Sequence, residues 1–118
     1  PGGCLVHGFD WKKAVGPISS QPDFAFGLDE YLKVCRDLDA EPLITVSDYA
    51  ATPQDAADLV EYLNAPADDK HPWAKKRAAW GHPQPYRVKY FEMGNESDHG
   101  NHELLPPKKF SASEYSQW

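Results

Sequence analysis

The amino-acid sequence predicts an α/β fold with a parallel sheet, and it predicts that residues 1–118 hold only part of that sheet. Short apolar runs that suit buried strands alternate along the chain with segments whose apolar residues recur at helical spacing. Each strand–helix–strand step implies a right-handed crossover between parallel strands. Three strands with two crossovers leave open edges, which buried parallel sheets do not normally expose to water. We therefore expect the other strands to lie outside this sequence.

The first 26 residues are rich in Gly and Pro and are expected to form a loop. Within them only Cys4-Leu5-Val6 suggests the end of a strand. A long irregular segment is uncommon in a compact small domain. We therefore expect this loop to serve a function within something larger.

The first complete helix–strand unit covers residues 28–46. Apolar residues at positions 28, 31, 32, 35 and 38 mark one face of a helix, and its first turn is acidic, as the helix dipole favours. The run Leu43–Val46 has the length and composition of a strand buried on both faces. This strand is expected to end at the turn residues Ser47-Asp48-Tyr49.

The second unit opens with the helix-start pattern Thr52-Pro53-Gln54-Asp55, which has an N-cap residue, a proline at the first helical position and an acid at the third. This helix is expected to continue to Asn64. A short helix is expected over residues 73–80 and ends at a glycine. A strand over residues 88–93 follows and ends at Gly94-Asn95-Glu96.

Charge and composition exclude several classes of partner. The net charge is −6, which argues against nucleic acid or an anionic membrane as the main partner. The basic cluster Lys75-Lys76-Arg77 is expected to complement the dipole at the end of the short helix. Cys4 and Cys35 form no metal or redox motif, and no apolar stretch reaches membrane-spanning length. Because the chain does not begin with Met, the sequence leaves open whether the protein is cytoplasmic or secreted.

The most specific chemical signal is the end of the last strand. In parallel α/β folds, functional residues collect at the carboxyl ends of the strands. Glu96 at such an end can donate a proton to a leaving oxygen, and Asn95 can hydrogen-bond a sugar hydroxyl. Elsewhere in a chain we would interpret both as ordinary turn residues.

Hydrolysis of a glycoside needs a second carboxylate, about 5–5.5 Å away for retention or about 6.5–9.5 Å away for inversion. Glu92 lies about 13 Å from Glu96 along an extended strand, so it is expected to make a buried polar contact instead. Asp48, at the end of the neighbouring strand, is one candidate, and a residue outside the chain is the other. Asp98, His99 and His102 are better interpreted as a solvated loop than as a metal site.

A series of short motifs matches one known family in the same order. These are Pro1–Val6, Asp10-Trp11, Val15–Ile18, Gly27–Leu32, Ala40–Pro42, Val60–Asn64, Ala79–Tyr86, Val88–Tyr90 and Gly94–Glu96. On this ordered series the chain resembles the α-L-arabinofuranosidases of glycoside hydrolase family 51, as far as Gly100. Any one tripeptide would be weak evidence, whereas the ordered series is specific.

The resemblance implies a segment of a (β/α)8 TIM barrel, from the end of the second strand to just beyond the fourth strand. The remaining barrel strands and a C-terminal β-sandwich domain would lie outside residues 1–118. It implies that Glu96 is the general acid/base of a retaining double displacement, that Asn95 holds the sugar 2-hydroxyl, and that Cys4 lines the subsite of the cleaved arabinose. The nucleophile would be a Glu on the seventh strand, beyond this chain. The resemblance implies no cofactor or metal. Many relatives are homo-oligomers, and the resemblance leaves open whether the complete protein is one.

The chain departs from the family pattern at two places. The loop Gln21–Phe26 is shorter than the usual one, which carries a substrate-facing Trp, and Phe24 or Phe26 would substitute for it. The turn Ser47-Asp48-Tyr49 replaces one that usually contains Asn. Both changes touch the substrate pocket, so we expect Asp48 and Phe26 to contact the substrate. His7 and His82 are interpreted as structural.

We therefore predict an exo-acting retaining glycosidase that releases terminal α-L-arabinofuranosyl residues from plant oligo- or polysaccharides, although this chain alone is expected to be inactive. One alternative is a barrel glycosidase of other specificity, such as an endoglucanase. Another is a carbohydrate-binding domain without turnover. The last is a self-contained α/β module, which would require these 118 residues to fold cooperatively alone.

Overall fold

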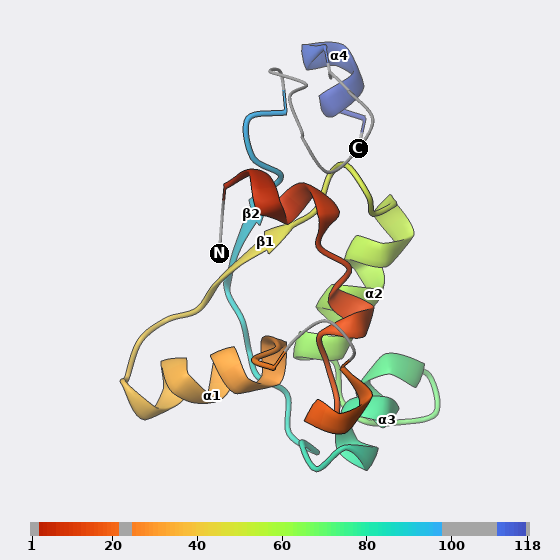
Figure 1. Ribbon diagram of the computed structural model, residues 1–118. Helices are drawn as coiled ribbons and strands as arrows, with labels where there is room; N and C mark the ends of the chain where they lie inside the picture. Colours follow the sequence, from red (N-terminus) through yellow and green to blue (C-terminus); the bar gives the residue numbers. More distant parts are fainter. Residues whose placement is uncertain (1–2, 22–24, 98–110, 118) are drawn as a thin grey trace.

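The computed structural model describes residues 3–21, 25–97 and 111–117, and within them two parallel strands form a sheet. Strand β1 (Leu43–Val46) pairs with β2 (Tyr90–Met93), with Leu43 opposite Tyr90 and Val46 opposite Met93. Figure 1 shows the strands side by side at the centre, with α4 beyond their carboxyl ends. The predicted α/β class with parallel pairing is confirmed. The place of these strands within a closed barrel stays a prediction.

The segment before α1 contains three short 3-10 helices, η1 (Cys4–Gly8), η2 (Trp11–Lys13) and η3 (Ile18–Ser20). The strand end that we expected at Cys4–Val6 is therefore wrong. Gly3 adopts a left-handed φ of 87°, and the backbone N–H of Val6 donates to the Gly3 carbonyl at 3.0 Å. This bond closes a helical turn where an extended backbone was expected.

Helix α1 (Leu28–Asp37) forms where the apolar spacing predicted it. Leu28, Leu32 and Cys35 face the core and are buried. The side chain of Glu30 reaches back to accept a hydrogen bond from the Gly27 backbone N–H at 2.8 Å, which satisfies one of the free donors at the helix start.

Helices α2 (Pro53–Asn64) and α3 (Pro72–Ala79) also agree with the sequence pattern. Thr52 and Asp55 form a reciprocal cap at the start of α2. The Thr52 hydroxyl accepts from the Asp55 backbone N–H at 3.2 Å, and the Asp55 carboxylate accepts from the Thr52 backbone N–H at 2.9 Å. The predicted start of α2 is confirmed, and α3 begins one residue earlier than expected.

Strand β2 begins at Tyr90, two residues later than predicted. Val88 is buried, but its backbone N–H and carbonyl pair with the side-chain amide of Asn64, at 2.8 and 2.9 Å. Because Asn64 occupies both polar groups, Val88 cannot add a rung to the sheet.

Helix α4 (Ala112–Tyr115) is a single turn capped by Ser111, whose side chain accepts from the Glu114 backbone N–H. The Tyr115 hydroxyl donates to the carbonyl of Met93, the last residue of β2. Helix α4 is thereby attached to the carboxyl end of the sheet. No helix in the described ranges has the length and apolar character needed to cross a membrane.

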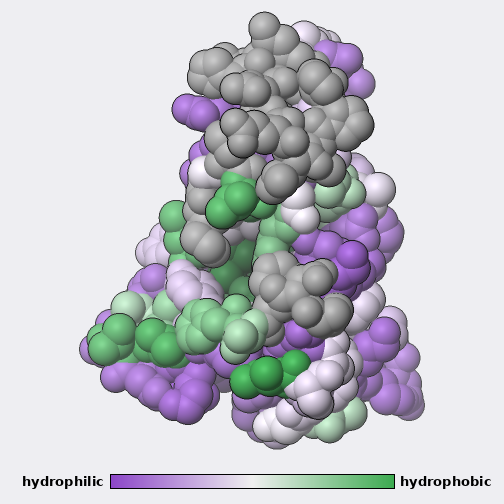
Figure 2. All heavy atoms as spheres, in the orientation of Figure 1, coloured by the Kyte–Doolittle hydropathy of each residue, from purple (hydrophilic) through white to green (hydrophobic). Residues whose placement is uncertain are grey.

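The hydrophobic core lies between η2, α1, α2 and one side of the strands. Its buried residues are Trp11, Val15, Leu28, Leu32, Ile44, Val46, Leu59, Tyr62, Leu63 and Val88. In contrast, Leu43, Tyr90 and Met93 on the strands are 48%, 54% and 41% exposed. Figure 2 shows hydrophobic side chains gathered on the surface over the strands and over α1. The sheet is therefore only partly covered by the described residues.

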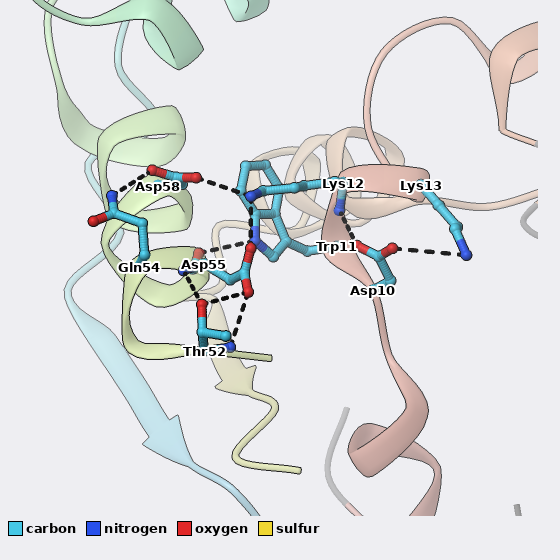
Figure 3. Close-up of polar contacts among 8 residues, drawn as sticks. All are labelled: Asp10, Trp11, Lys12, Lys13, Thr52, Gln54, Asp55 and Asp58. Atoms are coloured by element: carbon cyan, nitrogen blue, oxygen red, sulfur yellow. Dashed lines mark hydrogen bonds and ion pairs between the residues drawn. The ribbon is translucent and has the colours of Figure 1, made fainter. Parts of the chain in front are cut away.

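Lys12 connects η2 to α2 (Figure 3). Its ammonium group lies 2.6 Å from the Asp55 carboxylate and 2.9 Å from the Asp58 carboxylate, and it sits over the ring of Trp73 at 5.1 Å. Beside it, the indole N–H of Trp11 donates to the Asp55 carbonyl at 3.0 Å. These contacts fix the N-terminal segment against the start of α2.

Asp29 ties three other segments together inside the molecule. Its buried carboxylate accepts hydrogen bonds from the Gly16 backbone N–H at 2.9 Å, from the Tyr62 hydroxyl at 2.8 Å and from the Tyr86 hydroxyl at 2.6 Å. Burial, together with the Asp29 charge and hydrogen bond, raises the pKa of both tyrosines. The acidic first turn of α1 was expected only to complement the helix dipole, so this role of Asp29 is additional.

Arg77 differs from the expectation for the basic cluster Lys75-Lys76-Arg77. Its side chain is fully buried, and the guanidinium group donates to the backbone carbonyls of Tyr62, Ala65 and His82. Because a guanidinium presents several donors in one plane, it can satisfy several loop carbonyls at once. Arg77 is thus buried and joins the end of α2 to the loop after α3, whereas a charge at a helix end was expected.

Candidate active site

The carboxyl ends of β1 and β2 meet at one edge of the sheet. Beyond the last strand pair, the Gly94 backbone N–H donates to the Val46 carbonyl at 2.8 Å. Strand β1 then continues into Ser47 and Asp48, while β2 continues into the segment Gly94–Ser97, which we call the acid turn. Two of the strand ends that the sequence singled out are therefore neighbours in space.

Glu96 occupies an unusual backbone conformation in the acid turn. Its φ is +47°, in the left-handed region, and Gly94 two residues earlier has a φ of +66°. A non-glycine residue in this region costs on the order of 1–3 kcal/mol, and Asp39 and Arg87 adopt it as well, with φ of 53° and 61°. The positive φ angles at Gly94 and Glu96 turn the chain away from the strand direction and leave Glu96 exposed.

A pocket of about 410 Å³ lies against the acid turn. One side is formed by residues from the end of β2 and from the acid turn itself, including Glu96, and the other by Ser111, Ala112 and Tyr115 at α4. Glu96 thus lines a space that a ligand can enter.

Asn95 links the acid turn to the N-terminal segment. Its side-chain carbonyl accepts a hydrogen bond from the Gly3 backbone N–H at 3.1 Å. Since the oxygen is occupied, the NH2 group is the part of this amide that can donate to a sugar hydroxyl.

Asp48 lies behind the acid turn. Its side chain is fully buried, one carboxylate oxygen accepts from the Ser97 hydroxyl, and the other lies 3.3 Å from Nδ1 of His7. A side chain on Gly94 would overlap this carboxylate. Contact between Asp48 and substrate stays a prediction, while its observed partners are protein groups.

Of the other predicted substrate contacts, the structure places only Phe26, and not at the pocket beside Glu96. Phe26 is 57% exposed just before α1 and does not line the 410 Å³ pocket. Cys4 begins η1, but its side chain is outside what the structure describes. Phe24, Asp98, His99 and His102 also lie outside the described residues. The roles of Phe26 and Cys4 as substrate contacts stay predictions.

Glu92 makes the expected polar contact across the strands, where its carboxylate accepts from the Thr45 hydroxyl at 2.9 Å. Thr45 and Glu92 are register partners in the sheet. The burial that we expected for Glu92 is absent, because the described residues leave its side of β2 open to solvent.

A second pocket, of about 460 Å³, lies at the opposite end of the fold. It is lined mainly by residues 39–42 before β1 and 81–86 after α3. Parallel α/β folds carry their chemistry at the carboxyl ends of the strands. We therefore take the smaller pocket beside Glu96 as the candidate active site, although it is not the larger one.

Sequence reasoning missed two residues at this site. Ser97 was not singled out, although it directly follows the Gly94-Asn95-Glu96 motif, and His7 was interpreted only as structural. His7 is 1% exposed, and its ring meets Tyr49 edge-on at 5.3 Å between centroids. A histidine in a loop gives no sequence signal for a partner 41 positions away, whereas Ser97 was identifiable from its place in the motif.

Comparison with known proteins identifies the family of the chain. The family described as "Alpha-L-arabinofuranosidase 1 domain" matches residues 1–116. This match, together with the α/β fold, places the chain in a class of glycoside hydrolase domains. More narrowly, the chain belongs to the α-L-arabinofuranosidases of glycoside hydrolase family 51.

Individual relatives support the same assignment. The chain is 30% identical over 109 residues to an intracellular exo-α-L-arabinofuranosidase of Bacteroides ovatus, covering 82% of this chain and 21% of that protein. It is 32% identical over 116 residues to an extracellular exo-α-L-arabinofuranosidase of Streptomyces chartreusis, covering 76% and 14%. The chain thus spans at most about a fifth of the length of these relatives.

Solved structures give the same result at the level of the fold. The family 51 α-L-arabinofuranosidase of Thermotoga petrophila matches with a TM-score of 0.82 and 32% identity, over 98% of this chain and 25% of that one. An arabinose complex of the Thermotoga maritima α-L-arabinofuranosidase matches with a TM-score of 0.81 and 31% identity, over 100% and 27%.

Proposed function

We propose that the protein containing this chain releases terminal α-L-arabinofuranosyl residues from plant oligo- or polysaccharides, with Glu96 as the general acid/base of a retaining reaction. The observation that carries the proposal is the position of Glu96, exposed at the carboxyl end of β2 and at the rim of the 410 Å³ pocket. The names of the relatives favour this specificity over that of an endoglucanase, and one related structure is an arabinose complex.

In the proposed reaction, Glu96 first donates its proton to the glycosidic oxygen as the bond from that oxygen to the anomeric carbon breaks. A nucleophilic carboxylate attacks the anomeric carbon from the opposite face and forms a glycosyl-enzyme. Glu96, now ionised, accepts a proton from the water that releases the sugar. The nucleophile is a Glu outside residues 1–118, and the NH2 group of Asn95 donates to the sugar 2-hydroxyl.

We also propose that residues 1–118 are a segment of a (β/α)8 barrel that contains its third strand and reaches just beyond its fourth. The exposed strand residues Leu43, Tyr90 and Met93 support this, because apolar side chains on parallel strands are normally covered. So does the length of the relatives, of which the chain covers 14–21%. On this proposal the chain alone has no complete active site and is inactive.

The test uses the complete protein, wild type against Glu96→Ala, on 4-nitrophenyl α-L-arabinofuranoside. This leaving group needs little protonation, so glycosylation should continue while the glycosyl-enzyme accumulates for lack of a base. We expect kcat to fall by about 10²–10⁴-fold. Azide should restore turnover, because it attacks without a base, and the product should be the α-configured azide.

A β-configured azide would instead identify Glu96 as the nucleophile, and unchanged kinetics would remove it from catalysis. Glu41→Ala is the matched control, since Glu41 is an exposed carboxylate that pairs with Lys89 away from the acid turn. We expect Glu41→Ala to retain wild-type rates and to show no response to azide.

A further inference from the structure

We propose that Asp48 is a positioning residue for Glu96. Its buried carboxylate holds the acid turn from behind and thereby orients the Glu96 carboxyl group toward the glycosidic oxygen. This inference rests on the proposed function of Glu96 as the acid/base.

Contacts with neighbouring segments hold the acid turn in place. Gly94 donates to the β1 carbonyl of Val46, Asn95 accepts from Gly3, and Ser97 donates to Asp48. Glu96 lies between Asn95 and Ser97 and is exposed at the pocket. Ser97 follows Glu96 in the chain, so its bond to Asp48 holds the turn on the C-terminal side of Glu96.

Asp48 is packed directly against the acid turn. The carboxylate is 0% exposed, and there is no room for a side chain on Gly94 because that carboxylate occupies the space. A buried carboxylate is tolerated only where polar groups surround it. Ser97 and His7 are two such groups, one from each side.

The support behind Asp48 is itself fixed. The backbone carbonyl of His7 accepts from the Ser47 hydroxyl at 3.0 Å and from the Ala50 backbone N–H at 3.2 Å. The His7 ring is buried against Tyr49. Helix η1 and the segment after β1 are therefore hydrogen-bonded to each other, and Asp48 in that segment contacts the acid turn.

The backbone of Glu96 explains why such support is needed. A non-glycine residue stays in the left-handed region only where its surroundings determine the conformation. Without the bond from Ser97 to Asp48, the turn is free to relax toward an ordinary conformation and to move the carboxyl group. A shift of about 1 Å in a catalytic group can lower the rate by roughly 100-fold.

The test compares two substrates in the complete protein. 4-Nitrophenyl α-L-arabinofuranoside needs little protonation, whereas methyl α-L-arabinofuranoside has a poor leaving group that needs the acid. For Asp48→Ala and Ser97→Ala we expect kcat/KM to fall by about 10–100-fold on the methyl glycoside and by less than about 3-fold on the nitrophenyl glycoside. Ser97→Thr, which keeps the hydroxyl group, should preserve the wild-type ratio of the two values.

Asp29→Asn is the matched control, because Asp29 is also a buried carboxylate but lies among Tyr62, Tyr86 and Gly16. It should lower stability without changing the ratio. Glu96→Ala should lose more activity on the methyl glycoside than on the nitrophenyl glycoside. If it does, equal losses of kcat/KM on both substrates for Ser97→Ala would overturn the inference. If Glu96→Ala shows no such difference, the proposed function itself fails. Because Ser97 is only half-buried, its variant decides the question even if Asp48→Ala does not fold.

Discussion

Asp29 is a buried charge whose neighbours are arranged to stabilise it. Removing a carboxylate from water is unfavourable unless hydrogen bonds replace the lost hydration. A backbone N–H and two tyrosine hydroxyls do so here. Since burial and the Asp29 charge raise the pKa of Tyr62 and of Tyr86, both hydroxyls remain protonated donors at neutral pH.

Loss of one of these donors should lower stability measurably. We expect Tyr86→Phe to lower the free energy of unfolding of the complete protein by about 1.5–3 kcal/mol, because a hydrogen bond to a charged group is lost. Urea unfolding followed by circular dichroism measures this change. Tyr31→Phe is the control, since the bond from the Tyr31 hydroxyl to the Leu43 carbonyl is long, at 3.4 Å, and exposed. Equal effects of the two changes would contradict the role given to Asp29.

At the scale of elements, the start of α2 combines a cap with an ion pair. The Asp55 carboxylate caps the Thr52 backbone and also receives the Lys12 ammonium group (Figure 3). The hydrogen bond from Lys12 is the largest cause that lowers the pKa of Asp55, from 3.8 to about 2, and the bonds from Thr52 follow. Helix α2 is therefore coupled to η2 through one side chain.

This coupling predicts a pH dependence of stability. Because the pKa of Asp55 is lower in the folded state, its contribution is fully present above its ordinary pKa of 3.8 and is lost as the pH falls toward about 2. We expect about 1 kcal/mol to be lost across this window, less than a fully buried pair would give, since both partners are partly solvated.

Urea unfolding of the complete protein at steps from pH 5 to pH 2 measures this loss. In Asp55→Asn the free energy of unfolding should decline less steeply between pH 5 and pH 2 than in the wild type. Lys12→Met should also make this decline less steep. Identical slopes for the wild type and Asp55→Asn would show that the Lys12 contact does not stabilise the folded protein.

At the scale of the whole molecule, the sheet has more apolar surface than the described residues cover. Leu43, Tyr90 and Met93 are all more than 40% exposed. A pair of strands is marginally stable unless further strands or helices cover it. The remaining strands of the proposed barrel would bury these side chains.

We therefore predict that residues 1–118 expressed alone do not unfold in one sharp transition. Calorimetry should show a broad, weak transition, and a dye that binds apolar surface should fluoresce with the isolated chain but not with the complete protein. A sharp calorimetric transition in a sample shown to be monomeric by sedimentation would contradict the barrel proposal and favour a self-contained module.

The features that the sequence predicted correctly depend on neighbouring residues. The cap at Thr52, the strand Leu43–Val46 and the strand-end position of Glu96 can each be identified from a few adjacent positions. The late start of β2 depends on a contact between Val88 and Asn64, 24 residues apart. That contact comes from tertiary packing, which a local pattern does not contain.

The candidate site divides in the same way. Glu96 and Asn95 were recognisable from their motif, whereas the burial of Asp48 was not. Its partners Ser97 and His7 lie 49 and 41 positions away in the chain. Which polar residues become buried together depends on how the strand ends meet, and sequence spacing gives no direct measure of that.

The parallel pairing of β1 and β2 also affects how the protein folds during translation. Thr45 in β1 and Glu92 in β2 are 47 residues apart. At roughly 5–20 residues per second, a ribosome needs several seconds to make the second strand after the first. During that time β1 lacks its β2 partner, and one edge of this apolar strand stays unpaired. We expect this stretch to be a site at which molecular chaperones bind the growing polypeptide.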